Sequence, residues 1–251
     1  MLTDPPCSNP CSPRWIGHRG AGKLAPENTL PAFALGLAHG FTAFECDVRL
    51  SADGVPFLLH DDRLERTTNG HGPAGALTWA ELARLDAGDG APLPTLAALA
   101  AWARAHGVWL NLELKPNPGD AARTGRVVAT ALAGLGLAAD GVLLSSFVPE
   151  ALAAAQAAAP DWPRALLIDA NAAPDWSAVA QRLGCMAIVA HHPLVSGPDW
   201  VGAQQARGWQ VLTYTVNDAA RAQQLLAWGV AGLITDAVDR LGVTGDRTPA
   251  C

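Results

Sequence analysis

Short apolar runs alternate with longer amphipathic runs along most of this chain. The short runs are rich in aliphatic and β-branched residues and end at polar or glycine positions, which is typical of buried parallel strands. Eight strands are predicted, at Arg14–Arg19, Ala43–Val48, Val108–Lys115, Val142–Ser146, Arg164–Asp169, Met186–Ala190, Gln210–Thr215 and Gly232–Thr235. Apolar positions at a helical period predict helices between most of them, including Thr29–His39, Asp120–Ala133, Pro149–Ala158, Trp176–Leu183 and Asp218–Trp228.

Eight strands that alternate with helices predict a (β/α)8 TIM barrel. A doubly wound open sheet is the alternative, although such sheets more often have five or six strands. The connection between the second and third predicted strands is much longer than the others. It contains a hairpin-like segment at Val55–His60, a polar loop at Asp61–Gly75, and helical runs at Thr78–Leu85 and Thr95–His106. We therefore expect a small insertion, about residues 61–107, at the ligand-facing end of the barrel.

Composition and charge favour a folded, non-membrane domain that does not bind nucleic acid. The 251 residues are 50% hydrophobic and 16% charged, so residues 14–245 can form one folded domain, whereas the proline-rich segment 1–13 is expected to be a disordered tail. A net charge of -6 without a basic run argues against nucleic acid as a partner. The apolar runs are too short for a membrane span, and the N-terminus lacks the features of a secretory signal. The five cysteines are scattered, and a reduced, cytoplasmic protein is the simplest interpretation.

The first predicted strand ends in His18 and Arg19 and runs into a glycine-rich loop. An unpaired guanidinium in a protein core is very costly, so an anionic group is expected at this strand end. Asn28 or Thr29 can cap the helix that follows. The alternative is an ordinary strand–loop–helix joint with a surface histidine and arginine.

Acidic residues end the next two predicted strands. Glu45 and Asp47 are two residues apart and therefore share one face of their strand, and Glu113 has the same position on the following strand. In a barrel these three carboxylates converge at one mouth and repel one another. One divalent cation, Mg²⁺ or Ca²⁺, would remove that repulsion, because both ions prefer oxygen ligands. The alternative is a network of ion pairs with the cationic neighbours Arg19, Arg49 and Lys115.

Two histidines are directed at the same mouth. His60 follows an apolar run and leaves it at the edge where His18 also lies. Because histidine titrates near neutral pH, one imidazole can act as base while the other acts as acid. Arg19 and Lys115 add positive charge that can hold phosphate oxygens. The combination fits cleavage of a phosphodiester, whereas the Gly-x-Ser-x-Gly elbow of many acyl-transfer enzymes is missing from the sequence.

These motifs together resemble the glycerophosphodiester phosphodiesterase family. The resemblance covers about Trp15 to Gly242 and preserves the order of the motifs. It is carried by His18-Arg19-Gly20, Pro26-Glu27-Asn28-Thr29, Glu45-Cys-Asp47, Asp53-Gly54, His60-Asp61, Glu113-Leu-Lys115, Ser145-Ser-Phe147, Tyr214-Thr-Val-Asn217 and Ile234-Thr-Asp236. Gly22-Lys23-Leu24 and Leu64-Glu-Arg-Thr67 further resemble its bacterial cytosolic branch.

The resemblance implies a reaction and a set of roles. The family hydrolyses glycerophosphodiesters to sn-glycerol 3-phosphate and an alcohol with one divalent cation, through a cyclic glycerol phosphate. It implies that Glu45, Asp47 and Glu113 bind the metal, and that His18 and His60 form the acid–base pair. Arg19 and Lys115 would hold the phosphate, Glu27 would lie beside Arg19 and the metal, and Tyr214 would line the substrate groove.

One departure and several alternatives accompany this interpretation. Asp86-Ala-Gly88 runs almost directly into Pro92, whereas the family usually has a longer aromatic loop there, so the lid over the alcohol side is expected to be shortened. Two rival functions are a phospholipase-D-like activity on lysophospholipids and a non-catalytic barrel that binds phosphate ligands. The polar residues His191, His192, Asp169 and Asp236 also end predicted strands, either near the site or as ordinary polar strand ends.

Overall fold

Parallel strands close into a barrel in the computed structural model, which describes residues 13–242. Within this range eight parallel strands follow the order β1-β9-β8-β7-β6-β5-β4-β2, and β1 also pairs with β2, which closes the sheet. They are β1 (Trp15–His18), β2 (Ala43–Leu50), β4 (Trp109–Leu114), β5 (Val142–Ser146), β6 (Arg164–Ile168), β7 (Ala187–His191), β8 (Gln210–Tyr214) and β9 (Gly232–Thr235). The TIM barrel predicted from the sequence is confirmed. Most of the predicted tail, residues 1–12, lies outside the described residues.

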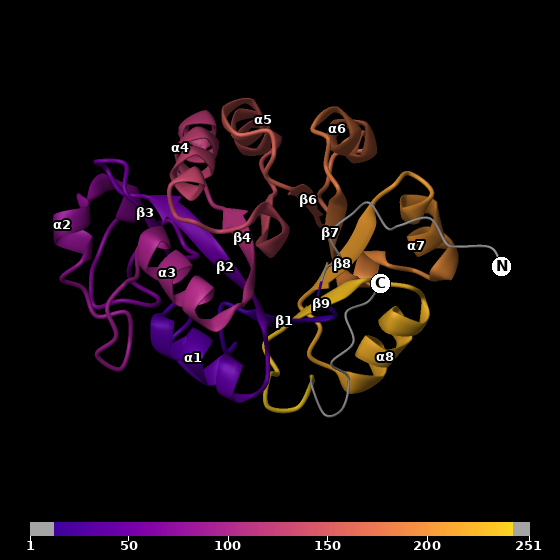
Figure 1. The fold of residues 1–251 in the computed structure, drawn as a ribbon, viewed down its shortest axis with the longest axis horizontal. Coiled ribbons are helices and arrows are strands. Elements are labelled where there is room, and N and C mark those ends of the chain that lie inside the picture. The colour runs from indigo at the N-terminus through magenta and orange to yellow at the C-terminus, as the bar shows by residue number, and fades with distance from the viewer. Residues whose placement is uncertain (1–12, 243–251) are drawn as a thin grey trace.

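Helices cover the outside of the barrel (Figure 1). They are α1 (Leu30–Ala38), α3 (Leu96–His106), α4 (Ala121–Ala133), α5 (Pro149–Ala158), α6 (Trp176–Arg182), α7 (Pro198–Gln205) and α8 (Ala219–Ala227). Short 3-10 turns occur at η1 (Ala74–Ala76), η2 (Ala139–Gly141) and η3 (His192–Leu194). The side chain of Thr29 accepts the backbone N–H of Ala32 and begins α1. Of the two cap residues expected there, Thr29 is therefore the one that caps the helix.

The apolar core has two layers because side chains alternate across the strands. One cluster fills the inside of the barrel and includes Ile16, Ala43 and Leu143. The larger cluster lies between the strands and the helices and includes Phe33 and Phe44, whose rings meet edge to face at 5.6 Å. The polar strand ends lie above the inner layer and form the site described below.

The long connection between β2 and β4 begins before the predicted insertion of about residues 61–107 and forms a small layer against β2. In this layer the strand β3 (Pro56–Leu58) pairs antiparallel with β2, and a separate apolar cluster that includes Phe57 and Leu82 lies beneath it. The predicted range also included α3, which is one of the outer helices of the barrel.

The helix expected at Thr78–Leu85 is only one turn, α2 (Trp79–Leu82). After α2 the chain continues in single turns, in which Arg84 N–H donates to the carbonyl of Glu81 and Leu85 N–H to that of Leu82. It then bends where the carboxylate of Asp86 accepts the backbone N–H groups of Gly88 and Gly90.

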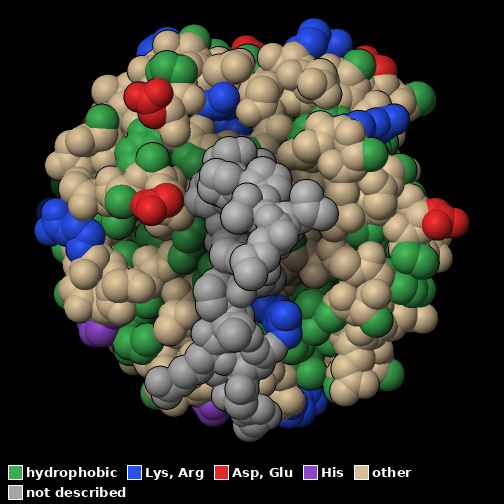
Figure 2. Space-filling view, turned by 45° about the vertical axis from the view of Figure 1, so that its right-hand side comes forward, with side chains coloured by type: hydrophobic (Ala, Val, Ile, Leu, Met, Phe, Trp, Pro, Cys, Tyr) green, Lys and Arg blue, Asp and Glu red, His purple; other side chains and the backbone are tan. Residues whose placement is uncertain are grey.

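The face drawn in Figure 2 has no large patch of one charge, because basic and acidic side chains lie singly among neutral ones. Among the helices of residues 13–242, none is long and apolar enough to cross a membrane.

Candidate active site

Three carboxylates meet at the C-terminal mouth of the barrel. Glu45 and Asp47 project from β2, and Asp47 lies in register with Glu113 on the neighbouring strand β4. All three residues are buried, and each offers an oxygen that lies within 4.8 Å of those of the other two. The convergence expected from the alternation of the strands is thus present.

The carboxylate cluster fits a divalent cation. Glu45 Oε1 and Asp47 Oδ1 are buried and have no hydrogen-bond partner among the described residues. Burial, and after it the charges of Asp47 and Glu113, raises the pKa of Glu45 well above its usual value. Burial also raises the pKa of Glu113 to about 7, with Lys115 opposing the shift. Buried oxygens that repel one another and lack donors are a suitable ligand set for Mg²⁺ or Ca²⁺.

Two cationic side chains border the cluster. Arg19 Nε lies 3.3 Å from Asp47 Oδ2, and Lys115 Nζ lies 2.7 Å from Glu113 Oε1 and 3.6 Å from Asp47 Oδ1. Although burial lowers it, the pKa of each cation is raised overall by these carboxylates, so both remain charged. In Asp47, burial raises the pKa, but Arg19 and Lys115 outweigh it and lower the pKa overall. The ion-pair network considered from the sequence therefore coexists with carboxylate oxygens that lack a hydrogen-bond donor within residues 13–242.

Arg49, the third cation considered for that network, has another role. It donates to the backbone carbonyl of His60 from Nε at 3.1 Å and from Nη2 at 2.7 Å, and to Asn117 Oδ1 at 3.3 Å. It therefore fixes the chain at His60 and forms no ion pair with the carboxylate cluster among the described residues. The sequence could not distinguish these roles, because His60 lies eleven residues after Arg49 and only the pairing of β2 with β3 brings the two together.

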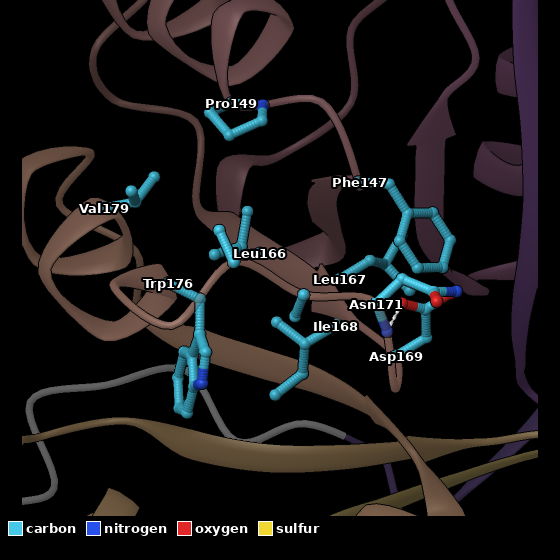
Figure 3. Close-up of a pocket in the computed structure, with 11 residues that line it drawn as sticks. Phe147, Pro149, Leu166, Leu167, Ile168, Asp169, Asn171, Trp176 and Val179 are labelled. Atoms are coloured by element: carbon cyan, nitrogen blue, oxygen red, sulfur yellow. Dashed lines mark hydrogen bonds between the residues drawn. The ribbon is translucent and has the colours of Figure 1, made fainter.

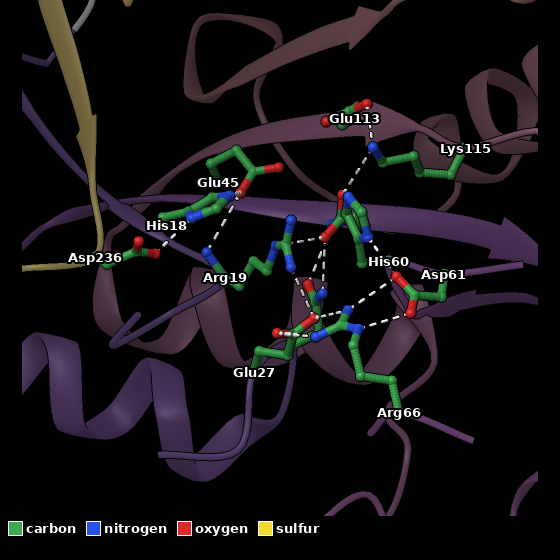
Figure 4. A network of polar contacts seen from close by, with 12 residues as sticks. His18, Arg19, Glu27, Glu45, His60, Asp61, Arg66, Glu113, Lys115 and Asp236 are labelled. Atoms are coloured by element: carbon green, nitrogen blue, oxygen red, sulfur yellow. Dashed lines mark hydrogen bonds and ion pairs between the residues drawn. The ribbon is translucent and has the colours of Figure 1, made fainter. Parts of the chain in front are cut away.

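Each of the two histidines is held by a carboxylate at one ring nitrogen. His18 Nδ1 lies 2.6 Å from Asp236 Oδ1, and its Nε2 lies 3.7 Å from Glu45 Oε2 (Figure 4). Burial raises the pKa of Asp236, but the hydrogen bond and charge of His18 lower it overall. The carboxylate fixes the orientation of the imidazole and directs Nε2 toward the cluster. Asp236, which the sequence left as either a supporting residue or an ordinary strand end, is the supporting residue.

His60 is held in the same way from the insertion side. Its Nδ1 lies 2.6 Å from Asp61 Oδ1, and Asp61 in turn accepts two hydrogen bonds from Arg66, at 2.6 and 2.9 Å. These Arg66 hydrogen bonds, followed by that of His60, hold the pKa of Asp61 far below its usual value. Burial is the main cause that lowers the pKa of His60.

Arg66 also connects the insertion to the first loop. It donates to both oxygens of Glu27, at 2.8 and 2.9 Å, and Glu27 Oε1 accepts from Arg19 at 2.8 Å (Figure 4). Burial raises the pKa of Glu27, but Arg66 and Arg19 lower it overall, so this residue is a carboxylate between two guanidinium groups. Glu27 therefore lies beside Arg19, as expected, but the described structure does not include it in the carboxylate cluster.

Asn28 is a site residue whose role the sequence analysis missed. Its Nδ2 donates to Asp47 Oδ2 at 2.8 Å, and its Oδ1 accepts the backbone N–H of Asp47 at 3.1 Å. Both Asn28 and Arg19 have a positive φ, 59° and 53°, a conformation that is uncommon outside glycine. In the sequence Asn28 is a candidate helix cap and part of the motif Pro26-Glu27-Asn28-Thr29, and neither observation indicates that its side chain bonds to Asp47.

Tyr214 lies on another part of the mouth. It ends β8, and its ring packs against Phe147 and His191, with centroid distances of 5.9 and 5.5 Å. The potential metal cluster found in residues 13–242 includes neither His191 nor His192. The mouth is thus divided into a carboxylate and imidazole side and an aromatic side.

The comparisons with known proteins identify the family. The model of the glycerophosphoryl diester phosphodiesterase family matches residues 18–240. The chain belongs to this family. The family predicted from the sequence is therefore confirmed.

Two full-length similarities support this assignment. A glycerophosphodiester phosphodiesterase described as putative, YhdW of Bacillus subtilis, is 30% identical over 234 residues, which is 89% of this chain and 94% of that protein. The structure of an Oleispira antarctica phosphodiesterase in complex with its product sn-glycerol 3-phosphate is 34% identical, with a TM-score of 0.84, and the alignment covers 89% of this chain and 93% of that one.

A third similarity is shorter. The glycerophosphoinositol inositolphosphodiesterase of Mus musculus is 48% identical over 89 residues, which is 32% of this chain. The chain thus matches only 16% of the length of that relative.

A further solved structure aligns over nearly its whole length. The glycerophosphodiester phosphodiesterase of Agrobacterium tumefaciens is 30% identical, with a TM-score of 0.77, and the alignment covers 91% of this chain and 98% of that one.

Proposed function

We propose that this protein hydrolyses glycerophosphodiesters to sn-glycerol 3-phosphate and an alcohol, with one bound divalent cation. The observation that carries the proposal is the placement of two carboxylate-held imidazoles, His18 and His60, beside one buried cluster of three carboxylates. The Oleispira relative, whose structure contains sn-glycerol 3-phosphate, supports the choice of product.

Glu45, Asp47 and Glu113 would hold the cation, which when bound supplies positive charge that polarises the phosphoryl group. Arg19 and Lys115 bind the phosphoryl oxygens from the side and stabilise the charge that develops there. The three carboxylates of the cluster outnumber the two cationic side chains Arg19 and Lys115, so a bound divalent cation would supply the additional positive charge that the phosphoryl group needs.

The two imidazoles move the protons. In the first step the 2-hydroxyl of the substrate attacks phosphorus, one imidazole takes its proton, and the other gives a proton to the alcohol that leaves. The product of this step is a cyclic glycerol phosphate, and the intramolecular attack gains from proximity. In the second step water opens the ring, and the two imidazoles exchange roles. Asp236 and Asp61 keep both rings oriented throughout.

The test is an assay of purified protein with glycerophosphocholine and lysophosphatidylcholine, in Mg²⁺ or Ca²⁺. We expect release of sn-glycerol 3-phosphate from the first substrate and a slower reaction with the second. Faster turnover of the lysophospholipid would favour the phospholipase-D-like rival, and binding of glycerophosphocholine without turnover would favour a non-catalytic barrel. The cytoplasmic location stays a prediction, which fractionation of the source cells can test.

A further inference from the structure

The aromatic side of the barrel mouth carries a second set of chemically distinctive groups. Phe147 follows β5, Asp169 follows β6, His191 ends β7 and Tyr214 ends β8, so all four come from neighbouring strand ends. Phe147 is 39% exposed and is one of the few large apolar side chains that are open to solvent among residues 13–242. None of these four groups is needed for the proton transfers proposed above.

The rings form a row that begins at the phosphate side of the site. Lys115 Nζ lies 5.7 Å from the centroid of Phe147, the rings of Phe147 and Tyr214 meet edge to face, and the ring of Tyr214 lies beside His191. The hydroxyl of Tyr214 donates to the carbonyl of Ile168 at 3.3 Å, next to Asp169. A group attached to a phosphate held by Lys115 can therefore contact the ring of Phe147.

A cavity continues from this row between β6, α5 and α6 (Figure 3). It has a volume of about 300 Å³, with Phe147 and Asp169 on one side and Trp176 on the other. A second cavity of about 240 Å³ shares Asp169 and Trp176 and adds Trp200. Asp169 thus provides a carboxylate between two cavities whose walls include aromatic rings.

The carboxylate of Asp169 is available to a cation. Its hydrogen bonds come from Asn171, from the backbone N–H to Oδ1 at 2.8 Å and from the side-chain amide to Oδ2 at 3.4 Å. No lysine or arginine of the described residues forms an ion pair with it. A half-buried carboxylate beside aromatic rings is a favourable binding site for an alkylammonium group. The carboxylate and the ring faces both attract the positive charge, and the rings also pack against the alkyl groups of the ligand.

We propose that Asp169, Phe147 and Tyr214 form a subsite for the positively charged headgroup of the substrate, so that the enzyme favours ammonium-bearing glycerophosphodiesters over neutral ones. The proposal rests on the proposed function. A neutral polyol headgroup would gain nothing from the charge of Asp169. An acyl chain in the same cavity would bury that carboxylate without a partner, which is costly.

The experiment compares two diesters that differ in headgroup charge, glycerophosphocholine and glycerophosphoglycerol, in the full-length protein loaded with Mg²⁺. The wild-type protein should show a higher kcat/KM for glycerophosphocholine. In Asp169→Asn the ratio of the two kcat/KM values should fall about 5- to 30-fold, the range that corresponds to one to two kcal/mol. Asparagine keeps the acceptor for the backbone N–H of Asn171, so the turn should fold normally. Asp169→Glu should restore part of the preference.

The matched control is Asp161→Asn. Asp161 is exposed and precedes β6, at the opposite end of the strand from Asp169, so the variant loses the same charge far from the mouth. Its ratio should equal that of the wild-type protein. Equal use of both substrates by the wild type, or an unchanged ratio in Asp169→Asn, would overturn the subsite and leave the hydrolase intact. No turnover of either diester would instead overturn the proposed function.

Discussion

At the scale of single residues, the site depends on polar contacts that fix side chains which would otherwise rotate. A histidine that transfers protons must present one nitrogen to the substrate, and it does so most effectively when the other nitrogen is held. Asp236 and Asp61 provide this restraint from opposite sides of the mouth. The two imidazoles are thus prepared for complementary roles before any substrate is bound.

Removing either imidazole should slow the reaction strongly. We expect His18→Ala and His60→Ala each to lower turnover of glycerophosphocholine by about 10²- to 10⁴-fold, the usual contribution of a general acid or base. Steady-state assays with Mg²⁺ measure this directly. His39→Ala, a change of an exposed histidine at the end of α1, serves as the control and should keep normal turnover. A near-normal rate in either site variant would contradict the acid–base assignment.

Asn28 should matter for stability because its amide is bonded to a buried charge. Asn28→Ala removes two hydrogen bonds to Asp47 and places alanine at a positive φ, so the free energy of unfolding should fall by about 2 to 4 kcal/mol. Asn28→Gly should lose less, since glycine tolerates this backbone conformation. Urea unfolding with chelator present measures both. Equal losses in the two variants would show that backbone strain contributes nothing.

At the scale of elements, the insertion is part of the site and not merely attached to it. Arg66 extends from the insertion to Glu27 in the first loop and to Asp61 beside His60. The same guanidinium thereby holds two loops that border the mouth, one near Arg19 and one near His60. A bidentate arginine suits this role, because its planar donors fix the direction of both carboxylates.

This bridge should give the protein a characteristic acid dependence. Arg66 lowers the pKa of Asp61 in the folded state below the ordinary value of 3.8, so the bridge stabilises the fold above about pH 4 and is lost as the pH falls toward the folded-state pKa. The difference in unfolding free energy between the wild type and Asp61→Asn should therefore be largest at neutral pH and shrink below about pH 4.

Urea unfolding at a series of pH values tests this dependence. Arg66→Met removes the other partner and should also flatten the acid side of the stability profile. If the wild type and Asp61→Asn differed by the same amount from neutral pH down to the acid range, the bridge would not be the origin of the effect.

Local patterns in the sequence predict the elements better than the contacts between them. Helix α5 (Pro149–Ala158) has the predicted bounds because Pro149 starts it and apolar positions repeat along it. Glu45, Asp47 and Glu113 follow from strand alternation in the same way. Arg66 and Asn28 could not be assigned, since their partners lie in other segments and a charged or amide side chain on a loop has no periodicity.

At the scale of the whole molecule, closure of the barrel is what makes the site. The residues of the first loop, β2, β4 and β9 lie far apart in the sequence, and only the pairing of β1 with both β2 and β9 brings His18 between Glu45 and Asp236. The apolar layers inside and outside the strands supply the stability of the closed form. At one mouth of the barrel the protein therefore holds three carboxylates whose mutual repulsion destabilises the folded state, and the packing of the rest of the fold offsets this cost.

A bound cation should relieve this repulsion and stabilise the folded protein. Chelator should abolish hydrolysis, and Mg²⁺ or Ca²⁺ should restore it and raise the Tm, because an ion that binds only the native state adds about 2.7 kcal/mol at one hundred times its Kd.

The Tm of Glu45→Gln should differ from that of the wild type in a way that depends on whether chelator or cation is present. With chelator the variant should be at least as thermostable as the wild type, since one of three repelling carboxylates is gone. With added cation its Tm should hardly rise, since a ligand is missing. A cation-dependent Tm shift of normal size in Glu45→Gln, or full activity of the wild type after exhaustive chelation, would contradict the metal site.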